Sequence, residues 1–229
     1  MTPLIMIPGF MCDQRLFGPQ IVALGRDRQI LVVVPTEPTV EAMAAAILGA
    51  TQGLICVAGL SMGGIVAMEM LRQAPDRIER LALMDTTPLA DAAENYETRN
   101  RQIKMVWKGH LAEIMREELK PAYLVDSDNR KAILQLCTDM AEGLGRHVFE
   151  AQSTAIRDRA DLQVALTQAP GNTLILHGSE DRLCPPEGHS LMHRLAPGSA
   201  LVSIPNAGHL PTLEQPAATT AALATWLYF

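Results

Sequence analysis

One stretch of this 229-residue chain decides its fold: Leu54-Ile55-Cys56-Val57-Ala58-Gly59-Leu60-Ser61-Met62-Gly63-Gly64-Ile65-Val66-Ala67-Met68-Glu69-Met70-Leu71. It has the pattern of an apolar strand, a glycine-rich turn and a helix, and the turn carries Gly-x-Ser-x-Gly around Ser61. A serine on such a sharp turn has a strained backbone, and Gly59 and Gly63 relieve the crowding around it. The helix that follows directs unpaired N–H groups and its positive end at the serine. Ser61 is therefore predicted to be a nucleophile.

Short apolar runs recur along the chain, and most are followed by a segment with helical apolar spacing. Buried strands that alternate with helices predict an α/β protein with a mostly parallel sheet and helices on both faces. We expect strands at residues 4–7, 30–34, 54–58, 81–84, 173–176 and 201–204, and helices at 41–50, 65–73, 187–195 and 216–227.

The alternation stops between about Leu89 and Ala165, where the sequence becomes charged and helical, with Pro121 as a break. We predict a helical lid at 89–165 between two parts of the core, 1–88 and 166–229. Its helices are expected at 95–107, 110–118, 129–140 and 148–157. Trp107, Tyr123 and Phe149 either line a substrate cavity or pack between helices. The charged side chains of this stretch are expected to form a solvated surface, and one of them is a candidate ligand for a substrate carboxylate. They are Arg99, Arg101, Lys104, Lys108, Glu117, Glu118 and Lys120.

Composition and charge exclude several classes of function. The net charge is −6 and no basic cluster occurs, which argues against nucleic-acid binding. No run approaches the ~18 apolar residues of a membrane span, and the first nine residues lack the basic region of a signal peptide. The four cysteines have no metal-site spacing. We expect a reduced, cytoplasmic protein with a small-molecule substrate, no metal, no cofactor and no nucleic-acid or membrane partner. The oligomeric state is left open.

A serine nucleophile needs a base to accept its proton and an acid to orient that base. His209 and Asp181 each follow a predicted strand, at the edge where parallel sheets hold their ligands. The order Ser61, Asp181, His209 is that of one class of serine hydrolases. Asp85 also follows a strand and competes with Asp181 as the acid, and Glu180 is a further alternative. We favour Asp181 because the motif around it matches the pattern of that class better. If Asp85 is not the acid, we expect it to be a turn or helix-capping residue.

The oxyanion of an acyl-transfer intermediate requires two N–H donors. One is expected from Met62, which follows the nucleophile. The other is expected from the loop after the first strand, where Gly9 allows the chain to turn. Phe10 N–H is our first choice for this second donor, and Met11 N–H is the alternative.

Taken together, these motifs resemble α/β-hydrolase fold proteins of the compact, lidded bacterial type, over essentially the whole core. The resemblance implies six strands in the spatial order second, first, third, fourth, fifth, sixth, although family members usually open with two further strands. It also implies hydrolysis of a small carboxylic ester, thioester or lactone by a Ser-His-Asp triad. The same triad serves carbon–carbon bond hydrolases, enol-lactonases, perhydrolases and menaquinone-pathway-type lyases, and a non-catalytic ligand-binding protein is the alternative of a different class. The matching motifs are Pro8-Gly9-Phe10, Gly59-Leu60-Ser61-Met62-Gly63-Gly64, Gly178-Ser179-Glu180-Asp181, Gly208-His209-Leu210 and Leu213-Glu214-Gln215-Pro216. Many members have His-Gly where this chain has Pro8-Gly9. Gln152 and residues 157–161 resemble the last lid helix.

Overall fold

The computed structural model describes residues 1–228 and has a single sheet at its centre. All neighbouring strands in this sheet are parallel, in the order β2-β1-β3-β4-β5-β6. The predicted α/β fold, the six strands and their spatial order are therefore confirmed. The strands are β1 (Leu4–Ile7), β2 (Ile30–Val32), β3 (Ile55–Leu60), β4 (Ile78–Met84), β5 (Thr173–Gly178) and β6 (Ala200–Ile204).

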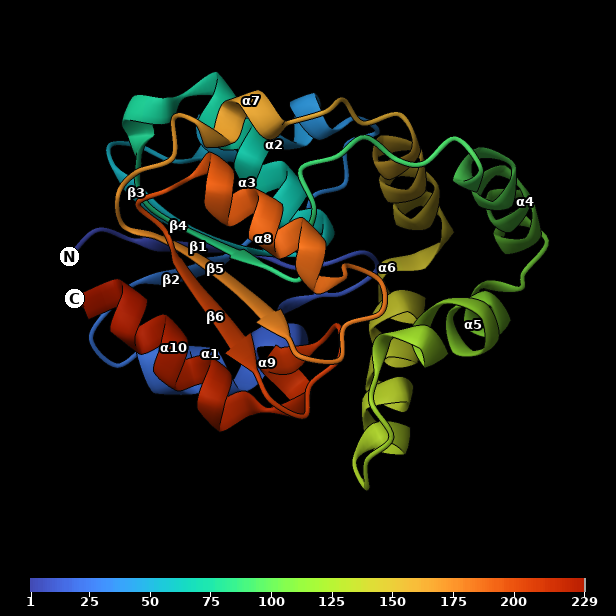
Figure 1. Cartoon of the computed structure of the whole chain (residues 1–229). Helices are drawn as coiled ribbons and strands as arrows, with labels where there is room; N and C mark the ends of the chain where they lie inside the picture. Colours follow the sequence, from blue (N-terminus) through green and yellow to red (C-terminus); the bar gives the residue numbers. More distant parts are fainter. Residues whose placement is uncertain (229) are drawn as a thin grey trace.

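Helices cover both faces of the sheet (Figure 1). Successive side chains of a strand point to opposite faces, and β1 shows the result. Leu4 and Met6 belong to the core cluster that includes residues of α1 and α10, whereas Ile5 and Ile7 belong to the cluster that includes residues of α2, α3 and α8. All four side chains are at most 1% exposed, as expected for a strand covered on both sides. One face carries α1 (Gly18–Leu24) and α10 (Pro216–Tyr228); the other carries α2 (Val40–Ala50), α3 (Met62–Gln73) and α8 (Pro186–Leu195).

The chain between β4 and β5 is helical. The part from α4 to α6 lies beyond the carboxyl ends of the strands (Figure 1), and we call it the helical segment. The two helices expected at 129–140 and 148–157 are joined into one, which is kinked at Gly145, where φ is 79°. The elements of the helical segment are α4 (Asn95–Trp107), α5 (Leu111–Glu113), the π-helical η3 (Ile114–Leu119), the 3-10 turn η4 (Lys120–Tyr123) and α6 (Arg130–Arg157). The helix α7 (Gln163–Leu166) follows this segment and lies beside α3 and α8. A short α9 (Pro211–Glu214) precedes α10.

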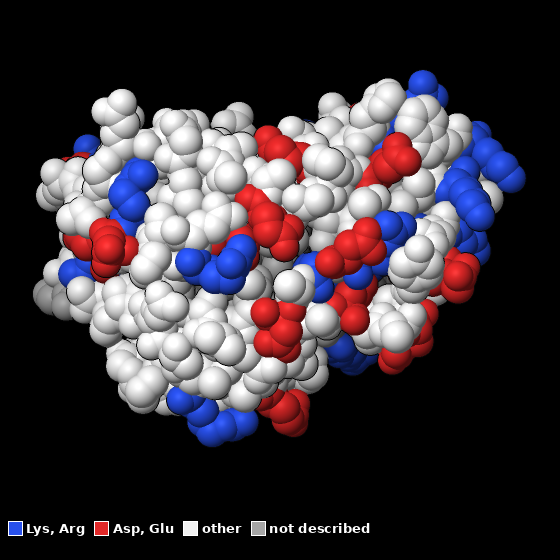
Figure 2. All heavy atoms as spheres, turned by 90° about the horizontal axis from the view of Figure 1, so that it is seen from above, with Lys and Arg blue, Asp and Glu red and all other residues white. Residues whose placement is uncertain are grey.

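The outer surface of the helical segment carries mixed charges. Figure 2 shows Lys and Arg gathered at this end of the molecule and interspersed with Asp and Glu. Arg101, Lys104 and Lys108 are exposed there, as expected. Lys120 is only 1% exposed, so its assignment to the solvated surface was wrong. No helix in residues 1–228 has both the length and the apolar character needed to cross a bilayer.

Candidate active site

Ser61 occupies the turn between β3 and α3 in a strained conformation. Its φ is 55° and its ψ is −116°, a region that residues with side chains rarely adopt. Ser61 N–H donates to Met84 O at 2.8 Å, and Thr86 Oγ1 donates to Ser61 O at 2.7 Å. The end of β4 and the residues after it therefore hold the strained turn in place.

The glycines around Ser61 are required by close backbone contacts. A Cβ added to Gly59 would lie 2.2 Å from Gly63 O, and a Cβ on Gly63 would lie 1.9 Å from Ile7 O. Backbone atoms of a buried sheet cannot move aside, so no larger residue fits at either position. The crowding inferred from the sequence is thus located between the start of α3 and the ends of β1 and β3.

The structure brings Ser61, His209 and Asp181 together in one hydrogen-bonded chain. His209 Nε2 lies 2.8 Å from Ser61 Oγ, and His209 Nδ1 lies 2.9 Å from Asp181 Oδ2. Asp181 Oδ1 accepts the N–H groups of Leu183 and Cys184 at 2.8 and 3.1 Å. The side chains of His209 and Asp181 are fully buried. Three residues separated by up to 148 positions therefore meet at the carboxyl ends of β3, β5 and β6.

The two competing carboxyl groups differ in their electrostatics. Burial alone would raise the pKa of Asp181, but its hydrogen bond and charge interaction with His209 outweigh burial and lower the pKa. Burial, followed by the neighbouring charge of Asp181, raises the pKa of Asp85 well above its usual range. Two adjacent buried carboxylates do not both ionise. Asp85 is accordingly the protonated member of the pair, and Asp181 is the ionised member.

Asp85 does not lie where it could act as the acid that orients His209. Its Oδ1 accepts Gly178 N–H at 2.8 Å, so it joins the end of β4 to β5. Its Oδ2 is buried and accepts no hydrogen bond from a donor in the described chain. Neither oxygen is bonded to His209, which is held by Asp181 instead.

Two N–H groups near Ser61 remain available for an oxyanion. Met62 is the first residue of α3, where helical N–H groups lack partners within the helix. In the loop after β1, Met11 has a φ of 54° and its N–H donates to Gln152 Oε1 at 2.8 Å. Phe10 N–H has no acceptor among residues 1–228. The geometry therefore favours Phe10 over Met11 as the second donor.

The turn η4 contacts both the Phe10 loop and the His209 loop. Lys120 Nζ donates to Phe10 O at 3.1 Å and lies 4.4 Å from the centre of the Tyr123 ring. His209 N–H donates to Tyr123 O at 2.6 Å. The rings of Tyr123 and His209 meet edge to face, with centroids 4.9 Å apart. The helical segment thus positions two separate parts of the site, a role that no sequence pattern indicated.

A buried thiol accompanies the buried Lys120. Lys120 Nζ lies 3.7 Å from Cys12 Sγ. A hydrogen bond from the Cys137 thiol and the charge of Lys120 outweigh burial and lower the pKa of Cys12 to about 6. The lowered pKa of Cys12 favours a thiolate beside the ammonium, and a charge of that sign would help to accommodate a lysine in this interior.

Glu214 fixes the loop that carries His209. Its Oε2 accepts the N–H groups of Gly208 and Leu210 at 3.0 and 3.1 Å, one on each side of the histidine. Its Oε1 accepts Val125 N–H at 2.8 Å, which ties the same loop to the helical segment. The sequence motif that contains Glu214 contributes to the family resemblance, but it does not predict this function of the carboxylate.

Ser61 faces a cavity of about 200 Å³ between the sheet and the helical segment. Tyr123 lines this cavity, while Phe149 packs against Phe10 with ring centroids 5.1 Å apart. Trp107 does not line it. The cavity wall also contains Asp91, Asn95, Arg99 and Arg159, of which only Arg99 had been considered as a ligand for substrate.

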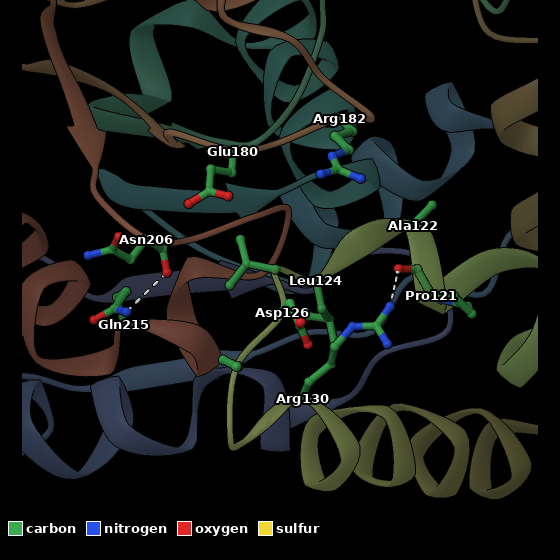
Figure 3. Close-up of a pocket in the computed structure, with 11 residues that line it drawn as sticks. Pro121, Ala122, Leu124, Asp126, Arg130, Glu180, Arg182, Asn206 and Gln215 are labelled. Atoms are coloured by element: carbon green, nitrogen blue, oxygen red, sulfur yellow. Dashed lines mark hydrogen bonds between the residues drawn. The ribbon is translucent and has the colours of Figure 1, made fainter.

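A larger cavity of about 710 Å³ lies on the other side of the Asp181 loop (Figure 3). Glu180 and Arg182 border it from that loop, and Arg130 crosses it to donate to Pro121 O at 2.8 Å. None of Ser61, Asp181 and His209 lines it. Ser61 therefore opens to the smaller cavity and not to this one.

The site is suited to proton transfer. Potential metal-ligand atoms of Asp181, Cys184 and His209 lie within 4.8 Å of one another. Asp181 and His209 hold each other by a hydrogen bond, and burial raises the pKa of Cys184 well above its usual range, so its thiol stays protonated. A protonated thiol is a poor metal ligand. The geometry instead suits transfer of the Ser61 proton to His209.

Comparison with known proteins identifies the family of this chain. The family model described as "Alpha/beta hydrolase family" matches residues 4–223. The chain belongs to the alpha/beta hydrolase family. This α/β-hydrolase is 28% identical to the pimeloyl-[acyl-carrier protein] methyl ester esterases of four Neisseria meningitidis strains, over 72–80% of its own length and 60–73% of theirs.

Solved structures give the same family. A thermophilic esterase from Thermogutta terrifontis, in a malate-bound form, is 31% identical, with a TM-score of 0.89 over 99% of this chain and 89% of the other. The enol-lactonase of Burkholderia xenovorans LB400 has a TM-score of 0.86 at 21% identity, over 100% of this chain and 92% of the other, and so shares the fold. The chain is an enzyme of the α/β-hydrolase family, and the Neisseria and Thermogutta relatives are named as esterases.

Proposed function

We propose that this α/β-hydrolase cleaves small carboxylic esters, thioesters or lactones through an acyl-enzyme on Ser61. The observation that carries the proposal is the hydrogen-bonded chain from Asp181 through His209 to Ser61, with distances of 2.9 and 2.8 Å, at the wall of a cavity. Ester hydrolysis is also the activity in the names of its esterase relatives.

His209 Nε2 accepts the proton of Ser61 Oγ as the oxygen attacks the substrate carbonyl. The negative charge that develops on the carbonyl oxygen is stabilised by the N–H groups of Met62 and Phe10, each worth about 3 kcal/mol in the barrier. His209 then donates its proton to the leaving oxygen or sulfur. Water repeats the sequence on the acyl-enzyme, and Asp181 stabilises the charged form of His209 throughout.

The size of the cavity supports a short acyl group. Its volume of about 200 Å³ corresponds to about seven water molecules at their liquid volume. We propose that residues 89–165 act as a lid that forms one wall of this cavity, because Arg99, Leu119 and Tyr123 face it opposite Ser61.

The decisive experiment compares wild type with Ser61→Ala on nitrophenyl esters of increasing acyl length, a lactone and a carbon–carbon bond substrate. We expect turnover of the short esters and a loss of at least about 10⁴-fold in Ser61→Ala. Ser153→Ala is the matched control, because Ser153 is buried and its Oγ has no partner in the described chain. Labelling by a fluorophosphonate should map to Ser61. A folded protein that stays unlabelled and turns over nothing would favour the ligand-binding alternative.

A further inference from the structure

The cavity over Ser61 contains two guanidinium groups and only one carboxylate. Arg99 comes from α4, Arg159 follows α6, and Asp91 precedes α4. The side chains are 20, 7 and 6% exposed, respectively. Two positive charges and one negative charge leave an excess of one positive charge in a poorly solvated space.

The carboxylate of Asp91 is fully used by its neighbours. Its Oδ2 accepts Arg99 Nε at 2.5 Å, and its Oδ1 accepts Asn95 Nδ2 at 3.0 Å and lies 3.4 Å from Arg159 Nη1. Burial would raise the pKa of Asp91, but the hydrogen bond from Arg99 and its charge outweigh burial and lower the pKa. Asp91 is therefore ionised and shared between the two arginines.

Both arginines keep unused donors. Arg159 Nε and Nη1 donate to Leu89 O and Ile156 O at 2.9 and 3.0 Å, which fixes its position. Its Nη2, and both terminal nitrogens of Arg99, have no acceptor within residues 1–228. Since both residues line the cavity, these N–H groups are accessible to a ligand there. A guanidinium fork with free N–H groups matches the geometry of a carboxylate.

We propose that the substrate of Ser61 carries a carboxylate a few bonds from the scissile carbonyl, and that Arg99, supported by Arg159, binds it. The inference rests on the proposed hydrolase function. A neutral acyl chain would displace water from the cavity and leave the excess charge uncompensated, which disfavours its binding. A carboxylate neutralises that charge. Half-esters of short dicarboxylic acids meet this requirement on the acyl side, and acetylated hydroxy acids meet it on the alcohol side.

The test compares kcat/KM for monomethyl glutarate with that for methyl valerate, a neutral ester of the same chain length, and adds O-acetylglycolate for the alcohol side. In Arg99→Gln we expect a loss of about 10- to 100-fold for at least one charged ester and less than about 3-fold change for methyl valerate. Asp91→Asn should act in the opposite direction and lower KM for the charged ester, because it removes the competing carboxylate. Arg101→Gln, on the exposed face of the same helix, is the matched control and should change neither.

Thermal unfolding establishes that each variant is folded. Equal losses of kcat/KM for charged and neutral esters in Arg99→Gln would overturn the inference while leaving the hydrolase function intact. If wild type hydrolyses no ester, binding separates the two proposals: calorimetry of monomethyl glutarate on Ser61→Ala, with and without Arg99→Gln, reports on Arg99 without turnover. Binding that weakens about 10-fold or more on loss of Arg99 supports the carboxylate site, and equal or absent binding refutes it.

Discussion

Gln152 Oε1, on α6, accepts the Met11 N–H at 2.8 Å, and Lys120 Nζ donates to the carbonyl oxygen of the same peptide group, Phe10 O, at 3.1 Å. The peptide between Phe10 and Met11 is thus bound on both sides by the helical segment. Its orientation determines where the preceding Phe10 N–H points. The proposed second oxyanion donor is therefore held by residues more than 100 positions away in the sequence.

Replacing Gln152 by Ala should lower kcat by about 10- to 100-fold with less than about 3-fold change in KM. The substitution leaves the buried Met11 N–H and Pro35 O without partners, and the loop then loses its fixed orientation. Steady-state kinetics on a short ester measures the effect. Gln20→Ala is the control, because Gln20 is equally buried but bonds to Thr212 O, away from the cavity. A Gln152→Ala variant that loses thermal stability as Gln20→Ala does, yet keeps its kcat, would contradict the positioning role.

Lys120→Met should raise the pKa of Cys12 above about 6, because it removes the adjacent positive charge and its hydrogen bond, while the larger effect of the Cys137 hydrogen bond remains. In wild type, a thiolate absorbance step should occur near pH 6, followed by ultraviolet titration. The step should move to higher pH in Lys120→Met. Cys12→Ser serves as the control and should abolish it. Persistence of the step in Cys12→Ser would assign the thiolate to another cysteine.

Gly63→Ala should prevent the native turn from forming, with a loss of more than about 3 kcal/mol in the free energy of unfolding. The added Cβ would lie 1.9 Å from Ile7 O, and a backbone atom in the sheet cannot yield. Gly188→Ala, in α8, has no atom within 4 Å of its added Cβ and should be neutral or stabilise by about 1 kcal/mol. Urea denaturation, or soluble yield if Gly63→Ala does not fold, distinguishes them. Equal stability of the two variants would show that this close contact is not required.

Asp85→Asn should make stability less sensitive to pH. The pKa of Asp85 in the folded protein lies above its unfolded value of about 3.9, so the folded state holds an extra proton between the two values. The stabilisation this proton gives is fully present below about pH 3.9 and is lost as pH rises toward the folded pKa, at about 1.4 kcal/mol per pH unit. Asn keeps the acceptor for Gly178 N–H and does not titrate.

The measurement is urea denaturation of both proteins at acidic and neutral pH. The unfolding free energies should be similar near pH 4, and Asp85→Asn should be the more stable protein near pH 7.5. An identical pH dependence in the two proteins would mean that Asp85 is ionised in the native state.

The strands could be predicted from sequence because each is a short apolar run next to a helix, whereas their spatial order was implied by the resemblance to α/β-hydrolases. Ser61, His209 and Asp181 could be placed because each lies in the turn or loop that follows a strand. The choice between Asp181 and Asp85 depends on which carboxylate reaches the imidazole, and that depends on the path of the loop after β5. Both follow a strand, so only the motif favoured Asp181.

The roles of residues in the helical segment could not be predicted from the sequence, because their partners are distant in it. Lys120 looks like a surface lysine among other charges, and its burial depends on Cys12 and Phe10, more than 100 residues away. Arg159 lies in the stretch 157–161 that resembles the last lid helix, but that resemblance assigns it no role; its position in the cavity wall depends on α6 ending where Asp91 and Arg99 lie. Side chains that meet across long loops leave no local periodicity in the chain.

The bonds from η4 and α6 to the Phe10 and His209 loops have a consequence for protein engineering. Exchanging the helical segment for that of another α/β-hydrolase, in order to transfer its substrate range, would also remove the anchors of the Phe10 and His209 loops. Such a chimera is expected to bind the new substrate yet turn it over slowly until Lys120, Tyr123 and Gln152 are restored. A change of substrate range in this protein is therefore expected to require the matching loop anchors as well.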